Sequence, residues 1–121
     1  MPTSVKVAPP NSLVLISDAH GGEIPEAMAG SLISSTTSCI AVGCQSDVDG
    51  ETEFTLGASQ QVDPGSQPAF QGRLRTPNGK ITVRSVLGKT ILEASVPRHE
   101  TMVRIWVNDS KEPDSVIVGI D

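Results

Sequence analysis

Three residues in the first quarter of the chain have the side chains that metal sites and general bases use. Asp18, His20 and Glu23 lie close together in SDAHGGE, and carboxylates with an imidazole can bind a metal ion or accept a proton. A metal site needs further ligands at fixed spacing, but the only other histidine is His99, far along the sequence. The stretch is therefore better interpreted as a polar loop after a strand, and we expect no metal and no other cofactor.

Other catalytic patterns are absent from the sequence. DVDGE, residues 47–51, alternates acids with a glycine as calcium loops do, but Gly50 is at the fourth position, where an EF-hand needs glycine at the sixth. A β-turn at Asp49-Gly50 explains this stretch. The chain has no Gly-x-Ser-x-Gly elbow and no phosphate loop. We therefore expect a protein that is not an enzyme and has no catalytic residues.

Four acidic residues stand at alternate positions of one short stretch: Asp47, Asp49, Glu51 and Glu53. The net charge of the chain is −5, with one basic and eight acidic residues in 1–72 but eight basic and six acidic residues in 73–121. This balance disfavours nucleic acid as a direct partner, because such binding depends on neutralising phosphates. It suits a basic protein partner, which the charge would steer towards these acids. A solvated hairpin that keeps the protein soluble is the alternative interpretation.

The only tryptophan lies in a stretch with the alternation of a β-strand. One face of residues 102–108 carries the apolar residues Val103, Ile105 and Val107, and the other carries Arg104 and Trp106. Trp and Arg are the residues most enriched in binding hot spots, so these two are candidate contact residues. Two alternatives stay open: Trp106 lies flat on the sheet among arginine stems whose charges pair with Glu93, or the face is reversed and Trp106 belongs to the core.

Turn-forming residues separate short segments rich in Val, Ile and Thr along the whole chain. These segments predict eight strands: Leu13–Ser17, Ser38–Cys44, Glu51–Leu56, Ala69–Arg75, Lys80–Val86, Thr90–Val96, Met102–Asn108 and Ser115–Ile120. Eight short strands joined mostly by tight turns predict an antiparallel β-sandwich, a single domain over residues 1–121.

The connections between the strands are also predictable in part. Asn78-Gly79 and Gly88 are each expected to close a β-hairpin, because both can supply positive φ angles. One short helix is expected to begin at Pro25 and to end near Gly30. Residues 31–39 suit a loop or an extended edge, and residues 57–68 are the expected flexible loop.

Cys39 and Cys44 are five positions apart, and on one strand an odd separation places them on opposite faces. We therefore expect two buried free thiols in a reducing compartment.

The first residues do not have the pattern of a secretory signal, and the longest apolar run, Leu13–Ile16, is too short to cross a bilayer. These features predict a cytoplasmic protein that does not enter a membrane.

The second half of the chain resembles a known family. From Ala69 it reads AFQGRLRTPNGKITVRSVLGKTILEASVPRHETMVRIWVND, with a Gly-marked turn, a strand that ends at Val96-Pro97 and a strand that carries Trp106. Over about residues 69–120 this order is similar to that of the competence nuclease inhibitors, the ComJ-like proteins. The resemblance implies a small acidic β-sandwich protein that binds and blocks a DNA-entry nuclease, and it assigns no functional residue.

Three hypotheses about function follow. The first is a non-enzymatic protein-binding module whose acidic residues 47–53, with Arg104 and Trp106 as further candidates, occlude a basic partner such as a nuclease. The second is a structural domain that self-associates, as a homodimer through edge strands or through the face of Arg104 and Trp106. The third, least favoured, is a small metal-dependent enzyme that uses Asp18, His20 and Glu23.

Overall fold

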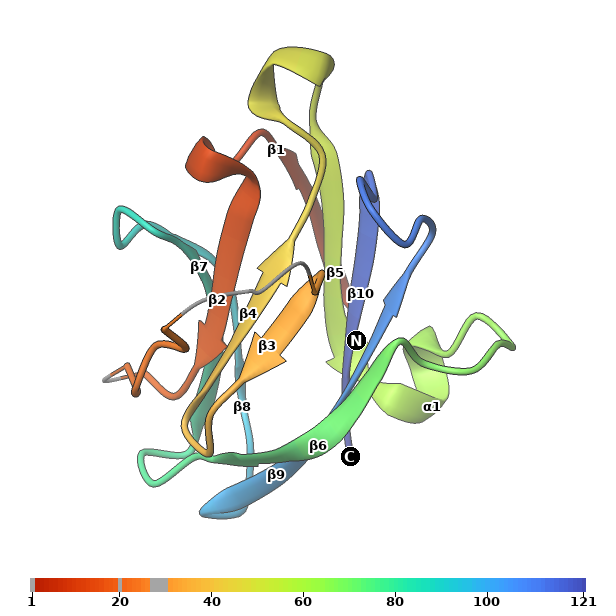
Figure 1. Cartoon of the computed structure of the whole chain (residues 1–121). Helices are drawn as coiled ribbons and strands as arrows, with labels where there is room; N and C mark the ends of the chain where they lie inside the picture. The colour runs from red at the N-terminus through yellow and green to blue at the C-terminus, as the bar shows by residue number, and fades with distance from the viewer. Residues whose placement is uncertain (1, 20, 27–30) are drawn as a thin grey trace.

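Two five-stranded sheets pack face to face in the structure, a computed structural model that describes residues 2–19, 21–26 and 31–121 (Figure 1). Sheet A has the strand order β1-β5-β10-β9-β6, and sheet B has the order β3-β4-β2-β7-β8. The strands are β1 Thr3–Val7, β2 Leu13–Ser17, β3 Ile33–Ser35, β4 Cys39–Gly43, β5 Thr52–Ala58, β6 Phe70–Arg75, β7 Lys80–Ser85, β8 Thr90–Ser95, β9 Glu100–Val107 and β10 Ser115–Ile120. The predicted β-sandwich is confirmed.

The core lies between the two sheets and consists of the alternate, inward-facing residues of each strand. Sheet A contributes Phe54, Leu56, Leu74, Val103, Ile105, Val116 and Val118, and sheet B contributes Val14, Ile16, Ile40, Val42, Ile81 and Val83. Val103 and Ile105 are fully buried here, so the predicted core face of their strand is confirmed. Cys44 lies in this core, whereas Cys39 is buried on the opposite face of sheet B, and both thiols are free as expected.

All eight predicted strands are present, and two more frame them. β1 pairs with β5 at the edge of sheet A, and β3 pairs with β4 at the edge of sheet B. β3 shows that residues 31–39 include an extended edge. β3 is only three residues long, and in β1 the alternation is limited to Val5, Lys6 and Val7, so neither pattern is long enough to reveal a strand in the sequence. One strand pair, β5 with β10, is parallel and not antiparallel.

Two of the predicted connections differ from the structure. The turn at Asn78-Gly79 does not close a hairpin, because β6 belongs to sheet A and β7 to sheet B. Gly79 has the predicted positive φ angle, but the turn carries the chain from one sheet to the other. The hairpin at Gly88 is confirmed, since β7 and β8 are antiparallel neighbours. Most of the helix predicted from Pro25, residues 27–30, lies outside the described residues.

The outer face of sheet A is partly covered by the segment that was expected to be a flexible loop. It contains the helix α1, Ser59–Val62, which follows β5 directly and turns back over the sheet (Figure 1). Gly57 on β5 and Gly119 on β10 are register partners beneath this helix. A Cβ added at Gly119 would lie 2.7 Å from Ser59 Oγ and 2.8 Å from Trp106 Cζ3. The two glycines therefore form a flat platform that lets α1 approach the backbone.

The outer face of sheet B is also covered. Leu15, Cys39 and Ala41 point away from the core and are nevertheless buried. The Glu23 N–H donates to Ser38 Oγ at 2.8 Å, and the Gly43 N–H donates to the Leu32 carbonyl at 2.8 Å. These bonds tie the connection between β2 and β3 to the sheet. Within the described ranges, no helix is long and apolar enough to span a membrane.

We expect Gly119→Ala to lower the free energy of unfolding by about 1–3 kcal/mol, because the new methyl group overlaps Ser59 and Trp106. The emission of Trp106, the only tryptophan, should shift to the red as α1 is pushed away. Chemical denaturation followed by fluorescence measures both effects. Gly88→Ala is the control: its φ of +90° makes alanine cost ~1 kcal/mol, but its Cβ would contact nothing within 4 Å, so the emission should not move. An unchanged stability for Gly119→Ala would contradict the close approach of α1.

Candidate functional site

Trp106 and Arg104 share the outer face of sheet A, as predicted, but their surroundings differ. Only 3% of Trp106 is exposed. Its indole Nε1 donates to the Ser66 carbonyl at 2.9 Å, and its ring lies against Gly119 and close to Ser59. Trp106 is therefore packed beneath the segment that contains α1. In this conformation it supports that segment and is not displayed, so its role as a contact residue stays a prediction.

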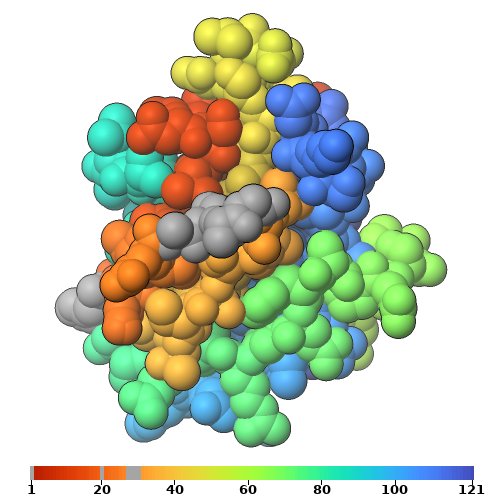
Figure 2. Space-filling model, viewed as in Figure 1, coloured from red at the N-terminus to blue at the C-terminus, as the bar shows by residue number. Residues whose placement is uncertain are grey.

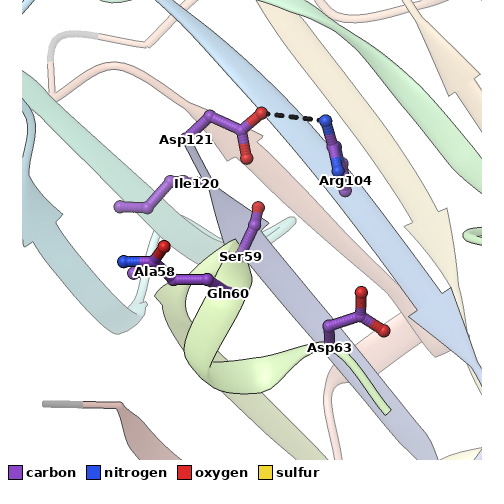
Figure 3. A pocket seen from close by; sticks show the side chains of 7 residues that line it. All are labelled: Ala58, Ser59, Gln60, Asp63, Arg104, Ile120 and Asp121. Atoms are coloured by element: carbon purple, nitrogen blue, oxygen red, sulfur yellow. Dashed lines mark ion pairs between the residues drawn. The ribbon is translucent and has the colours of Figure 1, made fainter. Parts of the chain in front are cut away.

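Arg104 is half-buried beside the same segment. Its Nη2 atom forms an ion pair with Asp121 Oδ2 at 3.1 Å, and 36% of each side chain is exposed. Both residues line a cleft between α1 and the sheet (Figure 3). The alternative in which arginine charges around Trp106 pair with Glu93 does not hold, because Glu93 lies on the other sheet. Arg73 lies on sheet A with Arg104 and pairs with Glu100 at 3.2 Å, whereas Lys80, Arg84 and Glu93 lie on sheet B.

The four acidic residues predicted as a binding surface do lie together at one end of the sandwich. Asp47 and Asp49 belong to a 3₁₀ turn, Asp47–Asp49, and Glu51 and Glu53 follow it into β5. The turn is well held: the Asp49 N–H donates to the Ser46 carbonyl at 2.9 Å, and Gln45 Nε2 donates to the Glu51 carbonyl at 2.8 Å. Asp47, Asp49 and Glu51 are exposed, and Glu53 is half-buried opposite Lys6 of β1.

A second acidic loop lies against the first, a contact that no pattern in the sequence predicts. The connection between β9 and β10 carries Asp109, Glu112 and Asp114, all exposed. The Glu53 N–H donates to the Asp114 carbonyl at 2.8 Å, so the two loops are in direct contact. The Gln45 N–H likewise donates to the Pro113 carbonyl at 3.0 Å. In Figure 2, the yellow and dark-blue residues of the two loops lie at the same end of the molecule.

The second loop has a defined conformation, which Asp109 stabilises. Its Oδ1 atom accepts hydrogen bonds from the Lys111 N–H at 2.7 Å and from the Glu112 N–H at 3.1 Å. These two backbone donors lower the pKa of the Asp109 carboxyl below its ordinary value. Asn108 adds a further link, since its Oδ1 atom accepts from the N–H groups of Asp114 and Ser115, each at 3.1 Å.

An apolar residue is exposed within this acidic end. Val48 stands between Asp47 and Asp49 at the tip of the first loop, and 87% of it is exposed. Isolated exposed apolar residues are common on protein surfaces. Here the residue is held on a hydrogen-bonded turn between two aspartates, a combination that suits an apolar anchor beside charged contacts. We call the surface formed by the seven carboxylates of the two loops and Val48 the acidic end.

Within the described residues, Asp18 and Glu23 of the stretch SDAHGGE do not come together in a site. Asp18 is buried and binds the turn between the sheets: its Oδ1 atom accepts from the Asn78 N–H at 3.0 Å and its Oδ2 atom from Asn78 Nδ2 at 2.6 Å. Glu23 is exposed, and His20 lies outside the described residues. Among the residues that the structure describes, no group of His, Cys, Asp and Glu side chains could hold a metal ion.

The chain is a small β-sandwich protein of two facing five-stranded sheets, and comparison with known proteins shows which structures share a similar fold. No protein-family model matches the chain, and no curated protein matches it by sequence. The fold is similar to that of ComJ from Bacillus subtilis, an inhibitor of the DNA degrading activity of NucA, with a TM-score of 0.64 and 12% identity over 99% of this chain and 93% of that chain. It is also similar to the protein of crocagin biosynthetic gene J, with a TM-score of 0.53 and 11% identity over 99% of this chain and 96% of that one.

The predicted resemblance to the ComJ-like proteins is therefore confirmed as a likeness of fold. The resemblance in sequence covers about residues 69–120, and the similarity in structure extends over nearly the whole chain. At 12% identity, the likeness carries the arrangement of strands and transfers no binding residue.

The lowered pKa of Asp109 gives a prediction about pH. Because the folded-state pKa lies below the unfolded value of about 3.9, the ionised carboxylate stabilises the fold above that pH, and this contribution is lost as the pH falls through the folded pKa. Asp109→Asn should therefore lower the melting temperature at neutral pH, and the difference from wild type should shrink as the pH approaches 3. Melting curves over this range test it; a difference that stays constant with pH would show that the charge of Asp109 is not involved.

Proposed function

We propose that this chain is a non-enzymatic binding module that uses its acidic end to occlude the basic cleft of a protein partner, most simply a nuclease. The observation that carries the proposal is the direct contact between two separate acidic loops, one of which exposes Val48 at its tip. The ComJ-like fold supports it, because ComJ is an inhibitor of a DNA-degrading activity.

The chemistry of a nuclease explains why carboxylates would block its substrate cleft. An enzyme that acts on DNA neutralises phosphates with lysine and arginine side chains in its substrate cleft. Carboxylates held at the mouth of such a cleft would pair with the same cations and exclude the DNA strand. The hydrogen bonds within and between the two loops hold the backbone that carries the carboxylates in place before binding, which reduces the entropy lost on association.

In this proposal the charges act on the association rate, and the apolar contact acts on the dissociation rate. The carboxylates accelerate encounter with a basic partner, an effect that salt weakens. Exposed charge pairs add little to affinity once the complex has formed. Burial of Val48 slows dissociation, since removing a valine side chain from water contributes about 1.5–3 kcal/mol. The steering should therefore appear in the association rate and the anchor in the dissociation rate.

The double variant Asp47→Lys and Glu51→Lys tests the steering. We would immobilise the wild-type protein, pass lysate of its source organism over it at low salt, and purify the basic protein that it retains. At low salt, the association rate of that protein with the variant should fall at least about tenfold, and the difference should narrow as salt is added.

The control makes the same change of charge elsewhere. Glu26→Lys with Glu93→Lys alters two exposed acids outside the acidic end and should leave most of the association rate intact. Equal rates for the wild type and the Asp47/Glu51 variant, or equal losses in both double variants, would rule out the acidic end as the docking surface. Retention of no protein would contradict the binding function itself.

Val48→Ala tests the anchor. It removes two methyl-sized groups from the contact and leaves every carboxylate in place, so the dissociation rate should rise about tenfold with little change in the association rate. Ile24→Ala is the control, because Ile24 is 54% exposed and lies outside the acidic end. A dissociation rate that rises equally in both variants, or in neither, would remove Val48 from the interface.

A further inference from the structure

A cleft of about 480 Å³ lies between α1 and the outer face of sheet A, remote from the acidic end. One wall is the helix and the residue after it, and the other is formed by Arg104 of β9 and the end of β10 (Figure 3). Five of the seven lining residues have polar side chains, namely a serine, a glutamine, an arginine and two aspartates. The cleft exists because α1 rests on the platform of Gly57 and Gly119, beside the arginine.

Two buried polar atoms in this cleft have no hydrogen-bond partner among the described residues. They are Ser59 Oγ and Arg104 Nε. Ser59 is only 7% exposed, and Gly119, above which its hydroxyl sits, is the register partner of Arg104. Burying a polar group without a partner destabilises a fold, so such groups usually have a role. Both atoms can donate a hydrogen bond, which calls for an acceptor oxygen in the cleft.

The charges around the cleft restrict what carries that oxygen. Arg104 is already paired through Nη2 with Asp121, and Asp63 lines the cleft as a second carboxylate. A phosphate or another polyanion would meet these two negative charges as well as the arginine. A simple cation would suit the carboxylates but would leave both donors without an acceptor. A ligand with one carboxylate and one ammonium group matches the donors and the acids together.

We propose that this cleft binds a small zwitterion of the α-amino acid class. The ligand carboxylate accepts from Arg104 Nε and Ser59 Oγ, and its ammonium group lies next to the carboxylates of Asp63 and Asp121. Figure 3 shows Ser59 between these two acids in the cleft. The proposal rests on no part of the proposed function, because it uses a different surface and a different ligand.

NMR titration of the isotopically labelled full chain tests this proposal. The probes are the common α-amino acids, with acetate, methylammonium and inorganic phosphate as partial ligands. At least one amino acid should shift the amide signals of Ser59, Arg104 and Gly119 at low concentration, and the partial ligands should bind more weakly. Saturable shifts confined to the cleft would support the site.

Two variants locate the contacts. Ser59→Ala removes one donor and should weaken binding about tenfold. Arg104→Lys keeps the positive charge but loses Nε, and it should weaken binding to a similar extent while the melting temperature shows that the fold is retained. Ser95→Ala, an exposed serine on β8, is the matched control and should bind as the wild type does.

Three results would overturn the proposal. No shift in the cleft with any amino acid would show that the donors serve no such ligand. Acetate or phosphate binding as tightly as the best amino acid would show an anion site. Methylammonium binding as tightly would show a cation site. None of these results bears on binding at the acidic end, which is measured with a protein partner.

Discussion

The parallel pairing of β5 with β10 is the constraint on which both candidate sites depend. At the start of the pair, Ser115 lies opposite Glu53, so the loop before β10 meets the loop before β5. Further along, Gly119 lies opposite Gly57, and the chain leaves β5 immediately afterwards to form α1. One register therefore brings two acidic loops together at one end and builds the glycine platform farther along. Slipping β10 by one residue against β5 would turn Gly119 away from the helix and leave Gly57 in place, because side chains alternate between faces.

The sequence predicts the strands well because their signal is local. Buried and exposed residues alternate along β9, and the interior of the sandwich selects the same Val and Ile residues that the alternation identifies. Turn chemistry is equally local, and Gly79 and Gly88 both have the positive φ angles expected of them. A turn does not determine which sheet receives the next strand, however. Asn78 is held by Asp18, a residue 60 positions earlier, and no local pattern contains that bond.

Only part of the candidate surfaces could be predicted from the sequence, because local patterns do not contain contacts between distant residues. Asp47, Asp49, Glu51 and Glu53 are neighbours in sequence, so their proximity could be predicted. Asp109, Glu112 and Asp114 join them through a strand pairing between residues more than fifty positions apart. The cleft is harder still, since Ser59, Arg104 and Asp121 come from three separate elements. Trp106 shows the limit most clearly: alternation gave its face correctly, but the segment that covers it is irregular and carries no periodic signal.

Gathering carboxylates at one end has a cost that bears on function. Like charges brought together repel, and folding alone would be favoured by spreading them over the surface. The cost is reduced locally, because backbone N–H groups solvate the Asp109 carboxylate and Lys6 faces Glu53. The two loops nevertheless hold the acids on fixed turns, because the Gln45 side chain donates to a backbone carbonyl and the side chains of Ser46 and Asn108 accept from backbone N–H groups. A surface that served only solubility would need no such fixed geometry, since flexible loops hydrate charge equally well. Rigid loops matter when charges must match those of a partner. The entropy of ordering the loops is then lost when the protein folds and not when it binds.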